Sequence, residues 1–340
     1  MEESQLKKHL LVIRLSAMGD VAMMVPVLYA FAKANPHFKI SVLTKPFHQP
    51  IVDTIPGVSC IVANVDTEHQ GFLGSFKLSS QLKKAGITHI ADMHKALRSE
   101  VLRFFMRLPS ATIDKGRHEK KALIAGNINQ LRSLKKTTER YQEVLEGLGF
   151  PKISPEVLPR PNPTDNVKAF AKKTLKKWIG IAPFAAHLGK QYPTNLMKAV
   201  IQELSKETMY QLFLFGAPDE AEKLKELSAG CDRVKVVAGQ LGFTDQINLI
   251  GQLDGMLSMD SGNGHLAAMY GVPTVTLWGV THPSLGFSPF GQEKNVITSD
   301  REKYPNIPTS VYGNVVPPGY EDVMSTICAE TVIEKVKDLL

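Results

Sequence analysis

The chain begins with short apolar runs separated by stretches of helical periodicity. Residues 10–13 form a continuous apolar run, which is typical of a strand covered on both faces in a parallel sheet. After a small polar turn, apolar residues recur at helical spacing over residues 21–34 and stop at Asn35 and Pro36. Residues 39–43 predict a second strand, so this part of the chain predicts one β-α-β unit.

The same alternation continues on both sides of a proline-rich segment. Residues 151–163 contain five prolines, a density that excludes a helix or a central strand, and we interpret them as a boundary between domains. Before this segment the pattern predicts strands at residues 58–62, 87–91 and 111–113 and helices at 75–85 and 97–107. After it the pattern predicts strands at 178–182, 211–215, 234–237, 255–259 and 274–277, helices at 196–206, 220–229, 243–250 and 265–270, a loop rich in glycine and proline at 313–320, and a final helix at 329–340.

Alternating strands and helices predict an α/β fold with two Rossmann-like, doubly wound domains. We expect the first domain at residues 1–160, the second at 161–325 and a terminal helix at 326–340. A length of 340 residues is sufficient for two such domains. In open parallel sheets ligands bind at the carboxyl ends of the strands, so we expect the loops of both domains to face a central cleft.

Composition limits the binding partners, the cellular compartment and the kind of membrane contact that we expect for this protein. The formal net charge is +7, which favours anionic partners or simply aids solubility. The three cysteines, Cys60, Cys231 and Cys328, are far apart, so a disulfide framework or a zinc site is not expected, and a reducing compartment such as the cytoplasm fits. No apolar stretch approaches the ~20 residues of a membrane span, so any membrane contact is expected to be peripheral.

The turn after the first predicted strand carries Arg14, Ser16, Gly19 and Asp20. Gly19 permits a tight turn or the close approach of a ligand. Asp20 lies near the start of the following helix, where a carboxylate either caps the helix or, at the carboxyl end of a strand, serves as a general base. Neither a Walker A motif nor a dinucleotide-binding glycine pattern is present here.

Two further turns in the second half of the chain point to an anion site. Residues 260–268 predict a strand end, a turn with Gly262 and Gly264, and a helix start whose amides could bind a diphosphate, with His265 as a further donor. Lys190 lies on a loop of small residues after the strand at 178–182, where it could reach the same diphosphate or simply be solvated. Both turns also have an ordinary structural interpretation, as a capped helix start and as a surface loop.

A basic segment lies in the later third of the first predicted domain. Such a run is usually a solvated face, but it could also attract an anionic glycolipid and the headgroups of a membrane. Nucleic acid is not expected as a partner, because no known nucleic-acid-binding module is recognisable. The segment consists of Lys115, Arg117, Lys120, Lys121, Arg132, Lys135, Lys136 and Arg140.

In combination, these segments resemble glycosyltransferase family 9, the lipopolysaccharide heptosyltransferases with a GT-B fold. The family's Arg-x-Ser-x-x-Gly-Asp is similar to residues 14–20, and its Pro-Gly-Ala…Lys-x-Trp-Pro is similar to residues 183–193. The most specific resemblance lies in residues 260–279, which are similar to the family's Asp-Thr/Ser-Gly-x-x-His-x-Ala-Ala…Gly-x-Pro-x-x-x-Leu-x-Gly. Residues 92–99 and 216–220 resemble two shorter family motifs, and the similarity covers about residues 10–340.

The resemblance implies an inverting transfer of heptose from ADP-heptose to a lipopolysaccharide core acceptor. It implies that Asp20 is the general base, with no metal and no cofactor beyond the nucleotide-sugar donor. It further implies an anionic glycolipid acceptor and peripheral contact with the cytoplasmic face of the inner membrane. The residues that it implies for the donor are Lys190, Glu220, Asp260, Ser261, Gly262, Asn263, Gly264 and His265, and those for the acceptor are Arg14, Ser16, Gly19, Arg98, Arg117 and Arg140.

Several positions depart from the family pattern. Phe184 stands in place of a glycine, His94 in place of a glutamine, and Gln191 and Tyr192 in place of Arg-Trp. Residues 185–186 are alanines where some members carry hydroxyl groups. These departures concern the sugar and the acceptor rather than the fold. They leave open a related transferase with another nucleotide sugar or surface-glycan acceptor, and a non-catalytic protein that binds a sugar nucleotide or glycolipid.

Overall fold

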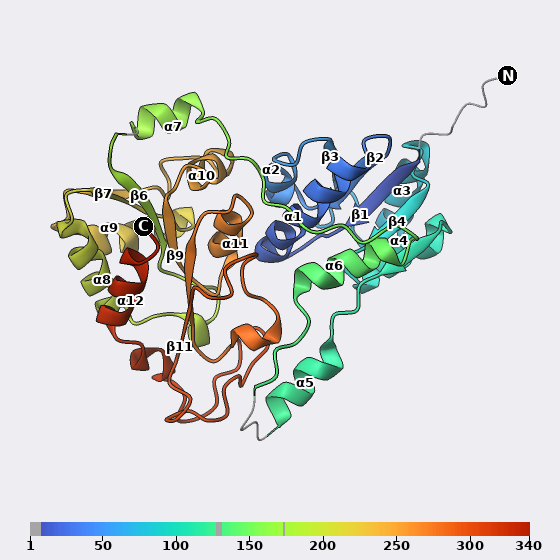
Figure 1. Ribbon diagram of the computed structural model, residues 1–340. Helices are drawn as coiled ribbons and strands as arrows, with labels where there is room; N and C mark the ends of the chain where they lie inside the picture. Colours follow the sequence, from blue (N-terminus) through green and yellow to red (C-terminus); the bar gives the residue numbers. More distant parts are fainter. Residues whose placement is uncertain (1–7, 127–130, 173) are drawn as a thin grey trace. The chain divides into compact units, whose positions relative to one another are not determined.

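The computed structural model describes residues 8–126, 131–172 and 174–340. It divides into two compact units (Figure 1). Unit 1 contains the described residues of 1–115 and 137–158, and unit 2 contains those of 116–136 and 159–340. No helix in these described ranges combines the length and the apolar character that crossing a bilayer requires.

Unit 1 is built on one parallel sheet with the strand order β3-β2-β1-β4-β5. The central strand β1 is fully buried, as its continuous apolar run predicts, and burial of each such side chain contributes ~1.5–3 kcal/mol. The strand order reverses between β1 and β4, which is where ligands bind in folds of this type. The strands are β1 (His9–Ile13), β2 (Lys39–Thr44), β3 (Val58–Val62), β4 (His89–Asp92) and β5 (Ser110–Thr112), and the helices are α1 (Met18–Ala34), α2 (Gln49–Val52), α3 (Gly71–Lys84), α4 (Leu97–Met106) and α6 (Thr137–Glu146).

Unit 2 repeats this plan with a larger parallel sheet of order β11-β10-β9-β6-β7-β8. Its order reverses between β6 and β9, so the loops after these two strands and after β10 form the expected ligand edge. The strands are β6 (Lys177–Ala182), β7 (Tyr210–Leu214), β8 (Val234–Val236), β9 (Gly255–Met259), β10 (Thr274–Trp278) and β11 (Val296–Thr298). The helices are α5 (Arg117–Ala125), α7 (Asp165–Phe170), α8 (Thr194–Lys206), α9 (Ala221–Ser228), α10 (Phe243–Ile250), α11 (Gly262–Ala268) and α12 (Ala329–Lys337), with short 3-10 helices η2 (Leu188–Lys190), η3 (Pro218–Glu220), η4 (Pro283–Leu285) and η5 (Val323–Thr326), and unit 1 has η1 (Pro46–His48).

The prediction of two parallel α/β sheets is confirmed, and the predicted strands recur within a few residues of their expected places. The proline-rich segment contains no helix or strand between α6 and α7. Four helices begin two to four residues earlier than predicted: α1 at Met18, α3 at Gly71, α8 at Thr194 and α11 at Gly262. The sequence pattern missed α2, α5, α6, α7 and β11, which are short or mostly polar and therefore give a weak periodic signal.

The segment of residues 116–136 groups with unit 2, whereas the sequence analysis assigned residues 1–160 to one domain. Its described contacts explain this grouping. The ammonium of Lys120 lies 4.0 Å from the ring centroid of Phe287, and Lys136 forms an ion pair with Glu293 at 2.5 Å. The Leu134 amide donates to the Ser284 carbonyl at 2.8 Å. The partners lie about 150 residues later in the chain, so no local pattern could reveal them.

Candidate functional site

In unit 1, the turn between β1 and α1 holds the Asp20 carboxylate by one of its two oxygens. Asp20 lies in the first turn of α1, and its Oδ2 accepts a hydrogen bond from the Ala17 amide at 3.1 Å. The same Oδ2 forms an ion pair with Arg14. Oδ1 contacts no residue in the described ranges through a hydrogen bond or ion pair, and the side chain is 27% exposed. Asp20 therefore caps the helix and still offers one oxygen to a substrate.

Arg14 is fixed from several sides. Its side chain is only 7% exposed, and Nη1 donates to the Met93 carbonyl at 2.7 Å. Its guanidinium lies 5.9 Å from the ring centroid of Tyr141, whose hydroxyl donates to the Asp20 carbonyl at 3.2 Å. Burial raises the pKa of Tyr141, so its hydroxyl remains a donor. Tyr141 comes from α6, and its role was missed because the sequence pattern did not predict this mostly polar helix.

Two neutral histidines share the electrostatic surroundings of Arg14 and Asp20. Burial, followed by the charges of Arg14 and Lys115, lowers the pKa of His94 to about 4. Burial, followed by Lys45 and Arg14, also lowers the pKa of His48. His94 lies on the loop after β4, and His48 ends the 3-10 helix η1 that follows β2. This edge of unit 1 therefore presents uncharged imidazoles beside an arginine–aspartate pair.

A fully buried carboxylate shapes the loop that carries His94. Asp92 is 0% exposed, and its Oδ1 accepts hydrogen bonds from the amides of His94 at 3.0 Å and Lys95 at 2.8 Å. Its Oδ2 lies 3.1 Å from Nε of Arg103. Lys95 adopts a left-handed conformation with φ 43°, which is uncommon for a residue with a side chain. The motif of Asp92 thus has a structural role in positioning the loop.

In unit 2, Lys190 and Asp260 come together at the carboxyl ends of neighbouring strands. Lys190 ends η2 after β6, Asp260 follows β9, and Nζ lies 2.7 Å from Oδ2. Thr281, which follows β10, donates to the same Oδ2 at 2.9 Å. The side chains of Lys190 and Asp260 are 15% and 7% exposed. An ammonium has three donors and Asp260 engages one, so Lys190 retains donor capacity for an anion.

Gly313 packs against the Lys190 side chain, and Gly189 and Gly279 continue this close packing without room for side chains. A Cβ on Gly313, whose φ is +82°, would lie 2.6 Å from Cγ and 2.7 Å from Cε of Lys190. A Cβ on Gly189 would lie 2.9 Å from the Gly313 carbonyl oxygen, and one on Gly279 would lie 2.2 Å from that of Gly189. The sequence marked residues 313–320 only as a loop. The structure makes Gly313 part of the packing that positions Lys190.

The other residues predicted for the donor lie on neighbouring loops of the same sheet. Ser261 is the N-cap of α11, and its Oγ lies 3.1 Å from Oγ of Ser258. His265 is buried in this short helix. Glu220 follows β7 at the end of η3, where its Oε2 accepts from the Ala217 amide at 2.7 Å. The remaining predicted donor residues, Gly262, Asn263 and Gly264, form the first turn of α11.

The arginines predicted for the acceptor have different surroundings. Nη1 of Arg98 donates to the carbonyls of Val65 at 2.9 Å and His69 at 3.1 Å, which ties α4 to the loop before α3. Arg140 is 2% exposed, and its Nη1 donates to the Asp114 carbonyl at 3.1 Å. Arg117 is exposed at the start of α5 and groups with unit 2, so it does not share a unit with Arg98 and Arg140. Ser16 and Gly19, in the turn beside Asp20, are half-buried.

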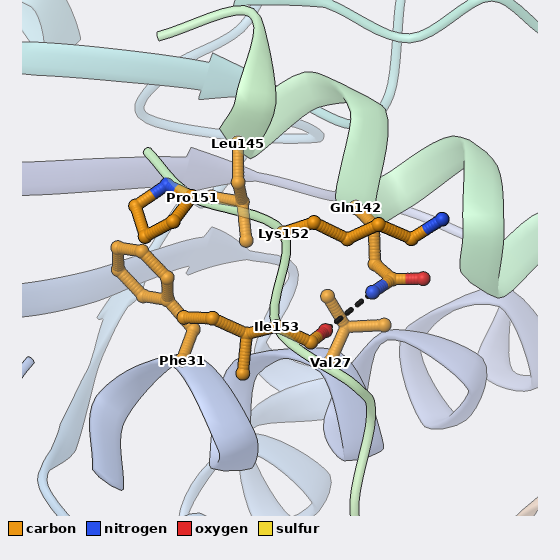
Figure 2. Close-up of a pocket in the computed structure, with 7 residues that line it drawn as sticks. All are labelled: Val27, Phe31, Gln142, Leu145, Pro151, Lys152 and Ile153. Carbon is orange, nitrogen blue, oxygen red and sulfur yellow. Dashed lines mark hydrogen bonds between the residues drawn. The ribbon is translucent and has the colours of Figure 1, made fainter. Parts of the chain in front are cut away.

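Unit 1 also contains a small pocket that is not lined by the predicted donor or acceptor residues. It lies between α1, α6 and the segment after α6 (Figure 2). The amide of Gln142 donates to the Ile153 carbonyl across its wall. None of the residues predicted for the donor or acceptor lines it, and its lining is Val27, Phe31, Gln142, Leu145, Pro151, Lys152 and Ile153.

Comparisons with known proteins identify the family. The family model for glycosyltransferase family 9 (heptosyltransferase) matches residues 75–315. A curated relative, the lipopolysaccharide core heptosyltransferase OpsX of Haemophilus influenzae, is 23% identical over 98% of this chain and 97% of its own length.

Solved structures share the fold over the full length. A family 9 glycosyltransferase from Veillonella parvula matches with a TM-score of 0.80 and 20% identity, over 100% of this chain and 98% of its own. The heptosyltransferase WaaC of E. coli, solved with ADP, matches with a TM-score of 0.72 and 18% identity, over 98% of this chain and 100% of its own. This likeness, with two parallel α/β sheets, confirms the predicted GT-B fold. Because the family model spans most of the chain, this protein is a glycosyltransferase that belongs to family 9, the heptosyltransferases.

Proposed function

We propose that the chain transfers heptose from ADP-heptose to a lipopolysaccharide core acceptor and inverts the anomeric carbon. The observation that carries this proposal is the geometry of Asp20, whose Oδ2 is held by Arg14 and the Ala17 amide while Oδ1 contacts no described residue. A general base needs a fixed position and one available lone pair. Support for the donor comes from the family and from the solved complex of WaaC with ADP.

In the proposed reaction, Oδ1 of Asp20 accepts the proton of the acceptor hydroxyl as its oxygen bonds to the anomeric carbon. The bond between that carbon and the diphosphate oxygen breaks on the opposite face, so the configuration inverts. ADP leaves with its bonding electron pair, and the growing negative charge on the diphosphate requires nearby donors. Lys190 would supply an ammonium for this purpose, in a position fixed by Asp260 and Thr281.

The remaining donor assignments follow the same sheet edge. We propose that His265 and the amides of residues 261–264 contact the phosphate and sugar of the donor, and that Glu220 contacts the ribose hydroxyls. Only Oε2 of Glu220 is used by the Ala217 amide, and a carboxylate has a second oxygen for such a contact. The leaving group would then be stabilised by the lysine and these amides without a metal ion.

For the acceptor, we propose Ser16 and Gly19 as contacts beside Asp20, and Arg117 as an exposed cation for acidic groups. Arg14, Arg98 and Arg140 already donate to backbone carbonyls, so their contribution to acceptor binding would come from the charge and donors that remain. We further propose that the protein works in the cytoplasm, at the inner face of the membrane where a lipid-linked acceptor resides. The net charge of +7 supports attraction to that anionic surface.

The decisive experiment measures turnover of ADP-heptose with a lipid A–core acceptor in Asp20→Asn and Asp20→Ala. Removing a general base lowers kcat by about 100- to 10,000-fold, while the affinity for ADP stays at the level of the parent protein. The matched control is Glu100→Gln, which changes an exposed acidic residue in the first turn of α4. Near-parent kcat in both Asp20 variants would refute the role of Asp20 as base.

The donor and the catalytic claim can be tested separately. Ligand binding stabilises the folded state by RT ln(1 + [L]/Kd), so a thermal-shift panel of ADP-, UDP- and GDP-sugars ranks the donors. The largest shift is expected with ADP-heptose. A larger shift with a UDP- or GDP-sugar would favour the related transferase with another donor. Binding of a donor without its transfer or hydrolysis in any acceptor mixture would favour a non-catalytic protein.

A further inference from the structure

The helices α3 and α4 of unit 1 carry a cluster of exposed aromatic side chains. Phe72 and Phe76 lie on α3 and Phe104 on α4, with exposed fractions of 64%, 57% and 66%. Phe105 joins them, because its ring centroid lies 5.0 Å from that of Phe72, 5.4 Å from that of Phe76 and 5.8 Å from that of Phe104. We call these four residues, with the neighbouring Leu73, the aromatic patch. Leu73 is also exposed.

The aromatic patch places large apolar side chains on the exposed face of a surface helix. Helix α3 buries small and aliphatic side chains, among them Ser75, Leu78 and Leu82, while its phenylalanines face outward. A helix that packs on a core normally exposes its polar face. The two helices pack against each other and lie side by side in Figure 1, so the patch is one continuous surface of unit 1. Contiguous exposed apolar surface of this kind indicates an interaction site.

The charges around the patch favour an anionic partner. Exposed lysines on α3 are Lys77, Lys83 and Lys84, and α3 itself contains no acidic residue. Lys77 is paired with Glu68 at 2.9 Å, and the one acidic residue of α4 is the exposed Glu100 in its first turn, which leaves Lys83 and Lys84 as the cations of α3 for a partner. Lys83 lies seven residues after Phe76 and thus on the same helix face. Arg107, also exposed, follows Phe104 at the end of α4. Aromatic side chains bordered by lysine and arginine are the composition of surfaces that lie in the headgroup region of a bilayer.

The basic segment singled out from the sequence still exposes Arg117, Lys121, Arg132 and Lys135. None of the exposed large apolar side chains of the described residues lies in it, so it lacks the aromatic component of the patch. At least three of its eight basic residues are engaged within the protein. Lys120 is buried over Phe287, Lys136 is paired with Glu293, and Arg140 is 2% exposed.

A second copy of this chain is a poor partner for the aromatic patch. In a twofold dimer the same patch would face itself, which would bring the lysines of α3 into opposition.

We propose that the aromatic patch of α3 and α4 is the surface by which this protein docks on an anionic lipid bilayer. The phenylalanine rings enter the interfacial region, and Lys83 and Lys84 contact acidic headgroups. The role of this docking in catalysis rests on the proposed function, because a lipid-linked acceptor is reached only at the membrane surface. The binding itself is measured without donor or acceptor, so it can succeed or fail independently of transfer.

The test measures co-sedimentation of the full-length protein with vesicles of phosphatidylglycerol and phosphatidylethanolamine in equal parts, and with neutral phosphatidylcholine vesicles. The combined variant Phe72→Ser, Phe76→Ser and Phe104→Ser should bind the anionic vesicles at least about tenfold more weakly than the parent. The matched control is Leu175→Ser with Met209→Ser, which removes exposed apolar side chains from unit 2 and should bind like the parent.

A charge variant separates the two contributions. Lys83→Gln with Lys84→Gln should weaken binding to anionic vesicles roughly 30-fold, since each basic residue near such a surface contributes about 1 kcal/mol. Binding to phosphatidylcholine vesicles should not change. Added salt should weaken the parent and leave the charge variant less affected.

Activity gives a second readout. The aromatic variant should keep parent-like transfer to a water-soluble, deacylated acceptor and lose transfer to the same acceptor embedded in vesicles. If the combined variant does not fold, which the thermal shift with ADP reports, the single variant Phe72→Ser carries the test because its side chain is largely exposed. Parent-like vesicle binding by either folded aromatic variant would overturn the proposal. So would a parent dimer that these variants convert to a monomer without any change in vesicle binding. Absence of both transfer reactions in the parent protein, with its vesicle binding intact, would instead count against the proposed function.

Discussion

The packing of Gly313 against Lys190 gives a prediction with an internal control. Gly313 and Gly319 have the same φ of +82°, and alanine at that angle costs ~1–2 kcal/mol at either position. A Cβ on Gly319 has nothing within 4 Å, whereas a Cβ on Gly313 would lie 2.6 Å from Cγ of Lys190. Both alanine variants should therefore share the cost of backbone strain, and only Gly313→Ala should also displace the lysine and lose the further stability of its ion pair with Asp260.

The size of the second effect follows from the bond that is lost. The displaced ammonium can no longer lie 2.7 Å from Asp260 and reach a diphosphate from that position. A hydrogen bond to a charged group contributes ~1.5–3 kcal/mol, so ADP affinity should fall roughly 10- to 150-fold in Gly313→Ala. In Gly319→Ala it should stay within about twofold of the parent.

Isothermal titration with ADP measures the affinities, and thermal unfolding measures the common strain, which should lower Tm by a few degrees in both variants. The reasoning is wrong if Gly313→Ala binds ADP as tightly as Gly319→Ala. It is also wrong if Gly319→Ala loses as much ADP affinity as Gly313→Ala, because backbone strain alone would then explain the loss.

Further predictions concern the groups beside these contacts. His94 has a pKa lowered to about 4, below its unfolded value of 6.5, so the stability that it contributes is complete above pH 6.5 and is lost as the pH falls towards 4. The unfolding free energy falls by up to ~1.4 kcal/mol per pH unit for one proton. Urea unfolding across that range should show a shallower fall in His94→Gln than in the exposed control His37→Gln. Thr281→Val removes the hydroxyl that donates to Asp260 and should weaken ADP binding by ~1–3 kcal/mol, whereas Thr281→Ser should restore it; equal affinity in both variants would show that the hydroxyl is not used. Tyr141→Phe removes one bond to a backbone carbonyl and should lower the unfolding free energy by ~1 kcal/mol in denaturant titration, and an unchanged midpoint would contradict that contact.

The sequence predicted those parts of the fold that depend on local pattern. The run at residues 10–13 and the periodicity at 243–250 are properties of neighbouring residues, and both elements form where expected. The turns with Asp20, Lys190 and Asp260 were also found, because each follows directly on a strand of the sheet.

The parts that the sequence did not reveal depend on contacts between distant segments. Gly313 lies over 120 residues from Lys190, and Tyr141 lies 121 residues from Asp20. Helix α5 has many charged residues, and its buried Lys120 lies against Phe287, more than 160 residues later in the chain. Hydrophobic periodicity states that a residue is buried but does not identify its partner.

The assignment of residues 116–136 to unit 2 has a consequence for how this polypeptide can be made. The chain passes from one unit to the other at residues 115–116, 136–137 and 158–159. A truncation at the proline-rich segment would therefore separate residues 116–136 from the rest of unit 2. Lys120 would lose its contact with Phe287, and Lys136 would lose its ion pair with Glu293. During synthesis these residues leave the ribosome before Phe287 and Glu293 have been made. Their contacts with unit 2 can therefore form only after the last third of the protein has been synthesised.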